Sequence, residues 1–135
     1  MYHFPDAAKG LATLLDGLGT SFGTSLTTYL RLQADFTDHL PAVHVMRVGG
    51  QVGAGGILRQ DRVNVVVYDR GSRAQDVAEE IRAAIADRDH DVEGVGLLDR
   101  VSVAEVPTDV PYPSDVVAQC AASYLVDTRP LPEPA

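Results

Sequence analysis

The sequence has one cysteine, no tryptophan and no long apolar run. Cys120 alone cannot form an internal disulfide or a thiolate metal site, and we expect it to be a small buried residue of a strand. No segment approaches the ~20 apolar residues that a membrane helix needs. The first ten residues also lack the basic and apolar regions of a secretory signal. We therefore expect a soluble chain that does not enter a membrane and is made in the cytoplasm.

Positive charge is also scarce, because 11 basic residues face 19 acidic ones, for a net charge of −8. Residues 1–60 carry four of each, so the whole acidic excess lies in residues 61–135. No basic stripe is present to neutralise phosphates, which argues against a protein that grips nucleic acid or an anionic membrane. The simplest interpretation is an acidic surface that keeps the protein soluble.

The apolar residues that are present recur with clear periods. A period of 3.6 predicts helices within residues 4–19 and 71–89, the first starting near Pro5 and Asp6, the second with a capping box of Ser72 and Gln75. Period-two alternation predicts strands, which we place at residues 20–36, 41–48, 62–69, 97–106 and 116–127. A short helix is the alternative for the first of these.

Polar and proline-rich segments separate the predicted elements. Residues 87–94 are expected to form a turn, and residues 107–115, with three prolines, a loop. The sequence predicts one α+β domain over residues 1–128, followed by a flexible proline-rich tail over 129–135. Its sheet is mixed, mostly antiparallel, with about four or five strands packed against two helices. Residues 41–48 and 62–69 are apolar on both faces, so we expect cover on each side.

Residues 49–57, "GGQVGAGGI", contain five glycines in nine positions. A phosphate-binding P-loop requires Lys and then Ser or Thr after its last glycine, but Gly56 and Ile57 stand there. A dinucleotide site requires a helix after the glycines, whereas a predicted strand follows. We therefore predict a long, mobile glycine-rich hairpin without a bound cofactor.

Other site patterns fail as well. Residues 87–98 begin like a calcium loop, but Val92 and Leu98 stand where glycine and a bidentate glutamate are required. The four histidines are isolated along the chain, so no zinc-binding spacing exists. No nucleophile elbow or acid/base carboxylate pair is recognisable. The sequence predicts no metal site and no enzyme.

The order of the segments resembles the tail terminator (tail completion) proteins of long-tailed bacteriophages that infect actinobacteria. The resemblance covers nearly the whole chain, and residues 20–39 fit it least well. It is carried by "FPDA" leading into a helix, "LPAVHVMRVGG" at 40–50, and "RVNVVVYDRGS" followed by the helix "AQDVAEEIRAAI". The proline turn before "AASYLVDTRPL" completes it. These are patterns of fold and contain no catalytic motif.

The resemblance implies a virion protein at the head-proximal end of the tail. Such a protein forms a hexameric ring that caps the tail tube, ends its polymerisation and joins the tail to the head or neck. Its partners are copies of itself, the major tail tube protein and the head–tail connector, and DNA passes through the lumen without specific binding. The acidic excess suits such a channel wall, because like charge opposes binding of phosphate.

We expect subunit and partner contacts at exposed connections of the fold. The first is the glycine hairpin with the arginines at its base, the second the turn over residues 69–73, and the third the loop over residues 107–115. The candidate interface residues are Arg47, Gly49, Gly50, Gly53, Gly55, Gly56, Arg59, Asp69, Arg70, Arg73 and Tyr112.

Three other functions stay open. A head–tail connector or neck protein of similar size is hard to separate from a tail terminator by sequence. A small regulatory α+β binding domain could use the glycine hairpin as a lid. The third is a hydrolase or transferase whose site is assembled from dispersed residues such as His44, Asp69 and Asp99.

Overall fold

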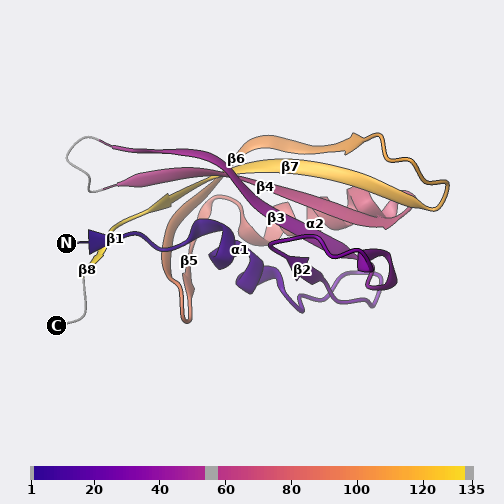
Figure 1. Ribbon diagram of the computed structural model, residues 1–135, viewed down its shortest axis with the longest axis horizontal. Helices are drawn as coiled ribbons and strands as arrows, with labels where there is room; N and C mark the ends of the chain where they lie inside the picture. The colour runs from indigo at the N-terminus through magenta and orange to yellow at the C-terminus, as the bar shows by residue number, and fades with distance from the viewer. Residues whose placement is uncertain (1, 54–57, 133–135) are drawn as a thin grey trace.

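The computed structural model describes residues 2–53 and 58–132 (Figure 1). In chain order the elements are β1 (Tyr2–His3), α1 (Ala7–Leu15), β2 (Thr27–Tyr29), the 3-10 helix η1 (Phe36–Asp38), β3 (Ala42–Val52), β4 (Arg59–Arg70), α2 (Arg73–Ile85), β5 (Arg88–Val92), β6 (Gly96–Val110), β7 (Val117–Thr128) and β8 (Leu131–Pro132). None of the described helices has the length and apolar character needed to cross a membrane.

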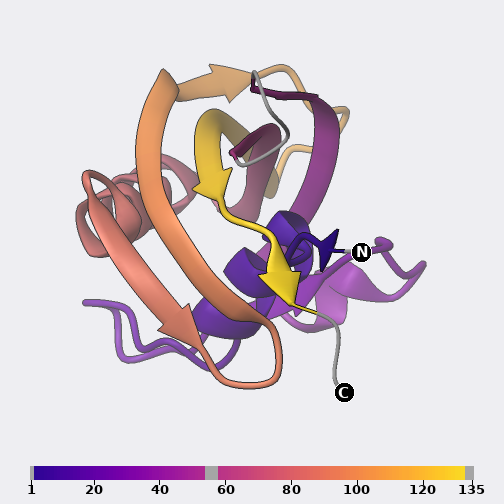
Figure 2. The same cartoon turned by 90° about the vertical axis from the view of Figure 1, so that its left-hand side faces the viewer.

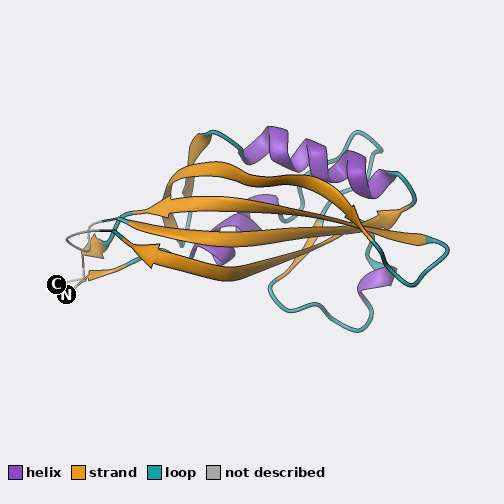
Figure 3. Cartoon of the chain, turned by 90° about the horizontal axis from the view of Figure 1, so that it is seen from above, coloured by secondary structure: helices purple, strands orange, loops and turns teal. Residues whose placement is uncertain are grey.

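The fold is α+β, as predicted, with a mixed and mostly antiparallel sheet and two α-helices. The strand order is β2-β3-β4-β7-β6-β5, in which only β2 and β3 are parallel. The main sheet has six strands, against the four or five predicted. Its long strands run side by side along the molecule (Figure 3). A separate pair, β1 with β8, joins the two ends of the chain, so Leu131 and Pro132 of the expected tail are paired.

Helix α1 begins where the sequence indicates. The Asp6 carboxylate accepts a hydrogen bond from the backbone N–H of Lys9 at 3.1 Å, which satisfies one of the free amides of the first turn. Leu11 and Leu15, four residues apart on one side of the helix, are completely buried against the sheet. The helix is thus fixed by its cap and by its apolar side.

Helix α2 has the predicted apolar stripe but not the predicted capping box. Ser72 precedes the helix without making a side-chain cap. Gln75 instead faces the sheet, where its Nε2 donates to the carbonyl of Pro107 and its Oε1 accepts from the Cys120 thiol, both at 3.3 Å. The box fails because Gln75 bonds to β6 and β7 and does not reach back to the start of its own helix.

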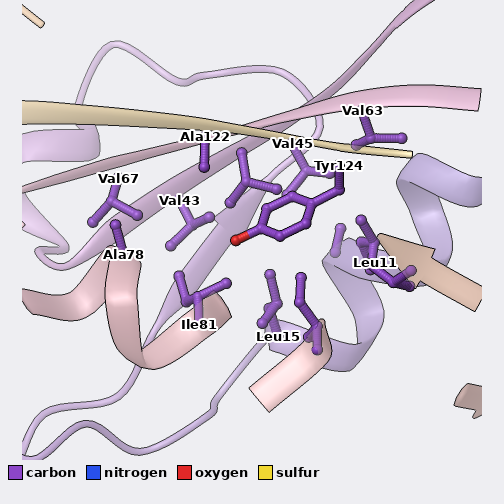
Figure 4. Close-up of a cluster of buried hydrophobic side chains, with 14 of the residues drawn as sticks. Leu11, Leu15, Val43, Val45, Val63, Val67, Ala78, Ile81, Ala122 and Tyr124 are labelled. Carbon is purple, nitrogen blue, oxygen red and sulfur yellow. The ribbon is translucent and has the colours of Figure 1, made fainter. Parts of the chain in front are cut away.

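Both helices pack on one face of the sheet and enclose a single large core. Valines of β3 and β4 meet leucines of α1 and Ile81 of α2 around the fully buried ring of Tyr124 (Figure 4). The Tyr124 hydroxyl has no hydrogen-bond partner in the described structure. Burial raises the pKa of this phenol, because the anion cannot be solvated there. This hydroxyl is therefore a buried polar atom that the surrounding core leaves without a hydrogen bond.

The opposite face of the sheet is covered at one end only. There Ala42, Val66 and Tyr68 form a second apolar cluster under the segment that contains η1. The Tyr68 ring lies 4.8 Å from Phe36 and 5.6 Å from Tyr112, measured between ring centroids. The predicted cover on both faces of the central strands is confirmed at this end. Towards the β3–β4 hairpin no described element crosses this face (Figure 3).

Three predicted boundaries are wrong. Residues 87–94 were expected to be a turn, but Arg88–Val92 form the edge strand β5, which pairs with β6. Strand β6 runs to Val110 through the expected loop, since a register shift between Glu105 and Thr108 leaves Pro107 outside the ladder. In residues 20–36 only β2 joins the main sheet, and the chain then leaves the sheet, so Leu30 is 48% exposed.

Candidate assembly site at the base of the β3–β4 hairpin

The predicted hairpin exists, but its strands reach further into the glycine-rich stretch than expected. Strands β3 and β4 pair from Ala42 with Tyr68 to Val52 with Arg59, and the N–H of Gly53 donates to the carbonyl of Leu58 at 2.6 Å. Gly49 and Gly50, expected in the loop, are therefore residues of β3. Gly55 and Gly56 lie outside the described residues.

A buried carboxylate, Asp61, organises the base of this hairpin. Asp61 is 1% exposed and stands on the helix-facing side of β4, in line with the core valines of that strand. Arg59 Nε donates to its Oδ1 at 2.9 Å, and Arg47 NH1 lies 3.6 Å from the same oxygen. The two arginines compensate the charge that would otherwise be costly to bury. We call Arg47, Arg59 and Asp61 the ionic cluster.

Gly50 is the direct cross-strand partner of Asp61. A Cβ placed on Gly50 would lie 2.3 Å from Asp61 Oδ1 and 3.0 Å from the carbonyl oxygen of Gln60. The first distance is far shorter than a carbon–oxygen contact allows, and the second is at its lower limit. Glycine is thus required at this position because the buried carboxylate occupies the space of a side chain. Gly49, by contrast, has nothing within 4 Å of such a Cβ.

The ionic cluster also contacts the N-terminal segment. The guanidinium carbon of Arg59 lies 5.8 Å from the centroid of the Phe4 ring, within the range of a cation–π contact. Thr128 of β7, the cross-strand partner of Arg59, is fully buried and its hydroxyl has no partner in the described structure. The contact between Arg59 and Phe4 thus links the segment before α1 to the ionic cluster.

A groove of about 980 Å³ opens beside the cluster. Its walls are the segment Phe4–Ala8 on one side and Leu30–Leu32 on the other, and residues of β3 and β4 lie between them. Strand β2 ends opposite His44, so from Val45 onward the edge of β3 that faces away from β4 has no strand beside it in the described part of the chain. The groove thus follows a free edge of the sheet, and we call this edge with its two walls the β3 groove.

Charge in the β3 groove differs from that of the chain. Three arginines, at positions 31, 47 and 59, and two carboxylates, at positions 6 and 61, line it. One of these carboxylates, Asp61, is buried in the ionic cluster, whereas Arg31 and Arg47 are exposed. A groove with a positive excess on a chain of net charge −8 favours an acidic partner.

The predicted turn over residues 69–73 lies at the other end of β4, about 36 Å away at ~3.3 Å per residue. Asp69 is buried, and its Oδ1 accepts from the N–H of Arg70 at 2.7 Å. The guanidinium carbon of Arg73 lies 4.8 Å from the centroid of the Phe22 ring. These three residues do not join the hairpin residues in one site.

Tyr112 belongs to a third place, the aromatic cluster with Tyr68 and Phe36. Burial raises the pKa of Tyr68, the neighbouring Tyr112 adds to the increase, and the hydrogen bond from Gln119 opposes it. These rings cover an apolar part of the sheet, so the contacts of Tyr112 in this structure are packing contacts.

No group of three or more His, Cys, Asp or Glu side chains among the described residues could hold a metal ion. Burial raises the pKa of the Cys120 thiol to about 11, with smaller contributions from Asp109 and Glu79, so this thiol stays protonated near neutral pH. His44, Asp69 and Asp99 lie on three different strands, and Asp99 pairs with Arg129 at 2.7 Å.

Neither a scan of protein-family models nor a search of curated proteins found a match for this chain. The candidate site is therefore identified from the geometry of this structure alone. Asp61 is the residue that the sequence analysis missed. The signal was available, because Asp61 continues the alternation of Val63, Val65 and Val67 on the helix-facing side of one strand. An acid in such a position requires positive partners nearby.

Proposed function

We propose that this protein is a non-enzymatic structural component of a phage virion, of the tail terminator type. In this proposal it forms a hexameric ring at the head-proximal end of the tail, caps the tail tube and ends its polymerisation. The ring contacts the major tail tube protein on one side and the head–tail connector or neck on the other. DNA passes through the lumen without specific binding.

The observation that carries the proposal is the incomplete cover of the sheet. An isolated domain usually protects its sheet edges, because free backbone N–H and C=O groups pair readily with other chains. Here β3 leaves an eight-residue edge free, and the opposite sheet face is open towards the hairpin. Copies of the same chain in a closed ring could cover such surfaces. The resemblance in the order of segments supports the same function.

Light scattering during size-exclusion chromatography of the purified chain tests the proposal. Six copies of a 14.4 kDa chain give a ring of about 86 kDa, and we expect this species to increase with protein concentration. Electron microscopy of the same fraction should show rings with an acidic lumen. A strict monomer at every concentration, or a ring with a basic lumen, would contradict the proposal.

Two alternatives remain. A neck protein would also form a ring, but it would bind the connector and leave tail-tube polymerisation unaffected. A regulatory binding domain is favoured by one observation, the β3 groove with its exposed arginines. That function predicts a monomer whose melting temperature rises on addition of a small anionic ligand, in proportion to the logarithm of the ligand concentration.

A further inference from the structure

We infer that the β3 groove receives strand β5 of a second copy of this chain. This inference rests on the proposed ring and names the contact that would close it. Both strands offer a free edge of one sheet, since the edge of β3 away from β4 is unpaired beyond His44 and β5 stands last in the strand order. Figure 2 shows them on opposite sides of the molecule. A contact between opposite edges is heterologous and can propagate around a ring.

The charges of the two edges are complementary. The segment over residues 87–93, which contains β5, has four acidic residues and one basic residue, all exposed. The acidic ones are Asp87, Asp89, Asp91 and Glu93. On the other edge Arg31 and Arg47 stand exposed beside β3. Pairing would therefore place carboxylates of one copy next to guanidinium groups of the other.

The same charges disfavour the wrong pairings. Two β5 strands placed edge to edge would bring together the eight carboxylates of two 87–93 segments, and two β3 edges would bring arginines together. Like charges at this distance cost free energy, whereas the mixed β3–β5 pairing gains it. Charged edge strands usually prevent association. In this chain the opposite charges of the two edges disfavour β5–β5 and β3–β3 pairing, and they permit the head-to-tail pairing of β3 with β5.

The dimensions of the two edges also agree. The five residues of β5 span about 17 Å, and the eight free residues of β3 span about 27 Å, at ~3.4 Å per residue. Val48 and Val52 on β3 are 49% and 55% exposed, so apolar surface is available next to the free backbone groups. Backbone pairing supplies affinity in such strand additions, and the flanking side chains supply specificity.

A charge-exchange experiment on the full-length chain tests the inference. The first variant carries Asp89→Arg and Asp91→Arg, and the second carries Arg31→Glu. None of these side chains makes a hydrogen bond or ion pair in the described structure, so folding should be retained. We expect each variant alone to associate at least ~10-fold more weakly than the wild type in light scattering. Mixing the two should restore the ring, because each altered edge then meets an edge of opposite charge.

The control carries Asp38→Arg and Asp115→Arg, which change the net charge by the same amount as the β5 variant at exposed sites away from both edges. It should assemble as the wild type does. If the wild type forms rings and both edge variants keep its mass, the β3–β5 contact is wrong while the ring proposal stands. If the wild type is monomeric throughout, both are wrong. Should the double variant not fold, Asp89→Arg alone gives the same comparison.

Discussion

The exchange Gly50→Ala should destabilise the protein strongly, although it adds one methyl group to an exposed residue. The new Cβ would stand 2.3 Å from Asp61 Oδ1, about 1 Å closer than the contact permits. Asp61 cannot swing away without losing the hydrogen bond from Arg59, and the new Cβ would also lie only 3.0 Å from the carbonyl oxygen of Gln60. Either the ionic cluster opens or β3 moves away from β4.

Both responses cost free energy of similar size. Losing a hydrogen bond to a buried charge costs about 1.5–3 kcal/mol. Forcing extra volume into a packed site costs about 1–3 kcal/mol. We therefore expect the free energy of unfolding to fall by about 2–4 kcal/mol, out of a total of roughly 5–15 kcal/mol for a domain of this kind.

Urea unfolding followed by circular dichroism measures this loss, with Gly49→Ala as the matched control. The control adds the same group to the preceding residue of the same strand, where nothing lies within 4 Å, so its effect should stay within ~0.5 kcal/mol. Adding Asp61→Ala to Gly50→Ala should remove the clash and show coupling of about 1 kcal/mol or more. Equal stability of the two alanine variants would refute the close contact between Gly50 and Asp61.

Two further predictions concern the core. Tyr124→Phe removes a buried hydroxyl without a partner and should raise the free energy of unfolding by about 1 kcal/mol in the same urea assay. Burial raises the folded-state pKa of Tyr124 above its ordinary value of 10.0, so the free energy of unfolding of the wild type should fall as pH rises past that value. The Tyr124→Phe variant should lose less of its free energy of unfolding over the same pH range. An equal loss in both proteins would contradict this prediction. The Cys120 thiol, with a pKa raised to about 11, should react with a disulfide reagent near neutral pH far more slowly in the native than in the urea-unfolded protein. Equal rates would mean that the thiol is accessible.

An element could be predicted from the sequence wherever its own residue pattern determines its secondary structure. Val63, Val65 and Val67 alternate on β4, and Cys120 and Tyr124 do so on β7, so these strands could be predicted from apolar period two alone. Strand β5 was missed because its alternation is hidden: only Val92 is an apolar inward residue, and the acidic residues between suggest a turn. A pairing partner, β6, makes this polar segment a strand, and no local pattern contains that partner.

The candidate site, too, could be predicted from the sequence only in part. The arginines at positions 47 and 59 could be placed near the hairpin, because they flank the glycine-rich stretch in the sequence. Their shared contact with Asp61 could not be predicted, since it depends on the register of β3 against β4. The turn over residues 69–73 could not be separated from this site without knowing the length of β4. Register and distance are properties of the folded sheet and not of any single segment.

The part of β3 nearest the hairpin turn lies outside the apolar core, and this determines which part of the strand a neighbouring copy would stabilise. From Arg47 to Val52 every residue of β3 is exposed, so this part is held by the strand ladder and the ionic cluster more than by the apolar core. Regions with few buried apolar contacts open at lower free energy than the core does. A second chain paired with this edge would bind the closed form and stabilise it by mass action. Ring formation should therefore slow amide hydrogen exchange in this part of β3 far more than in the core strands.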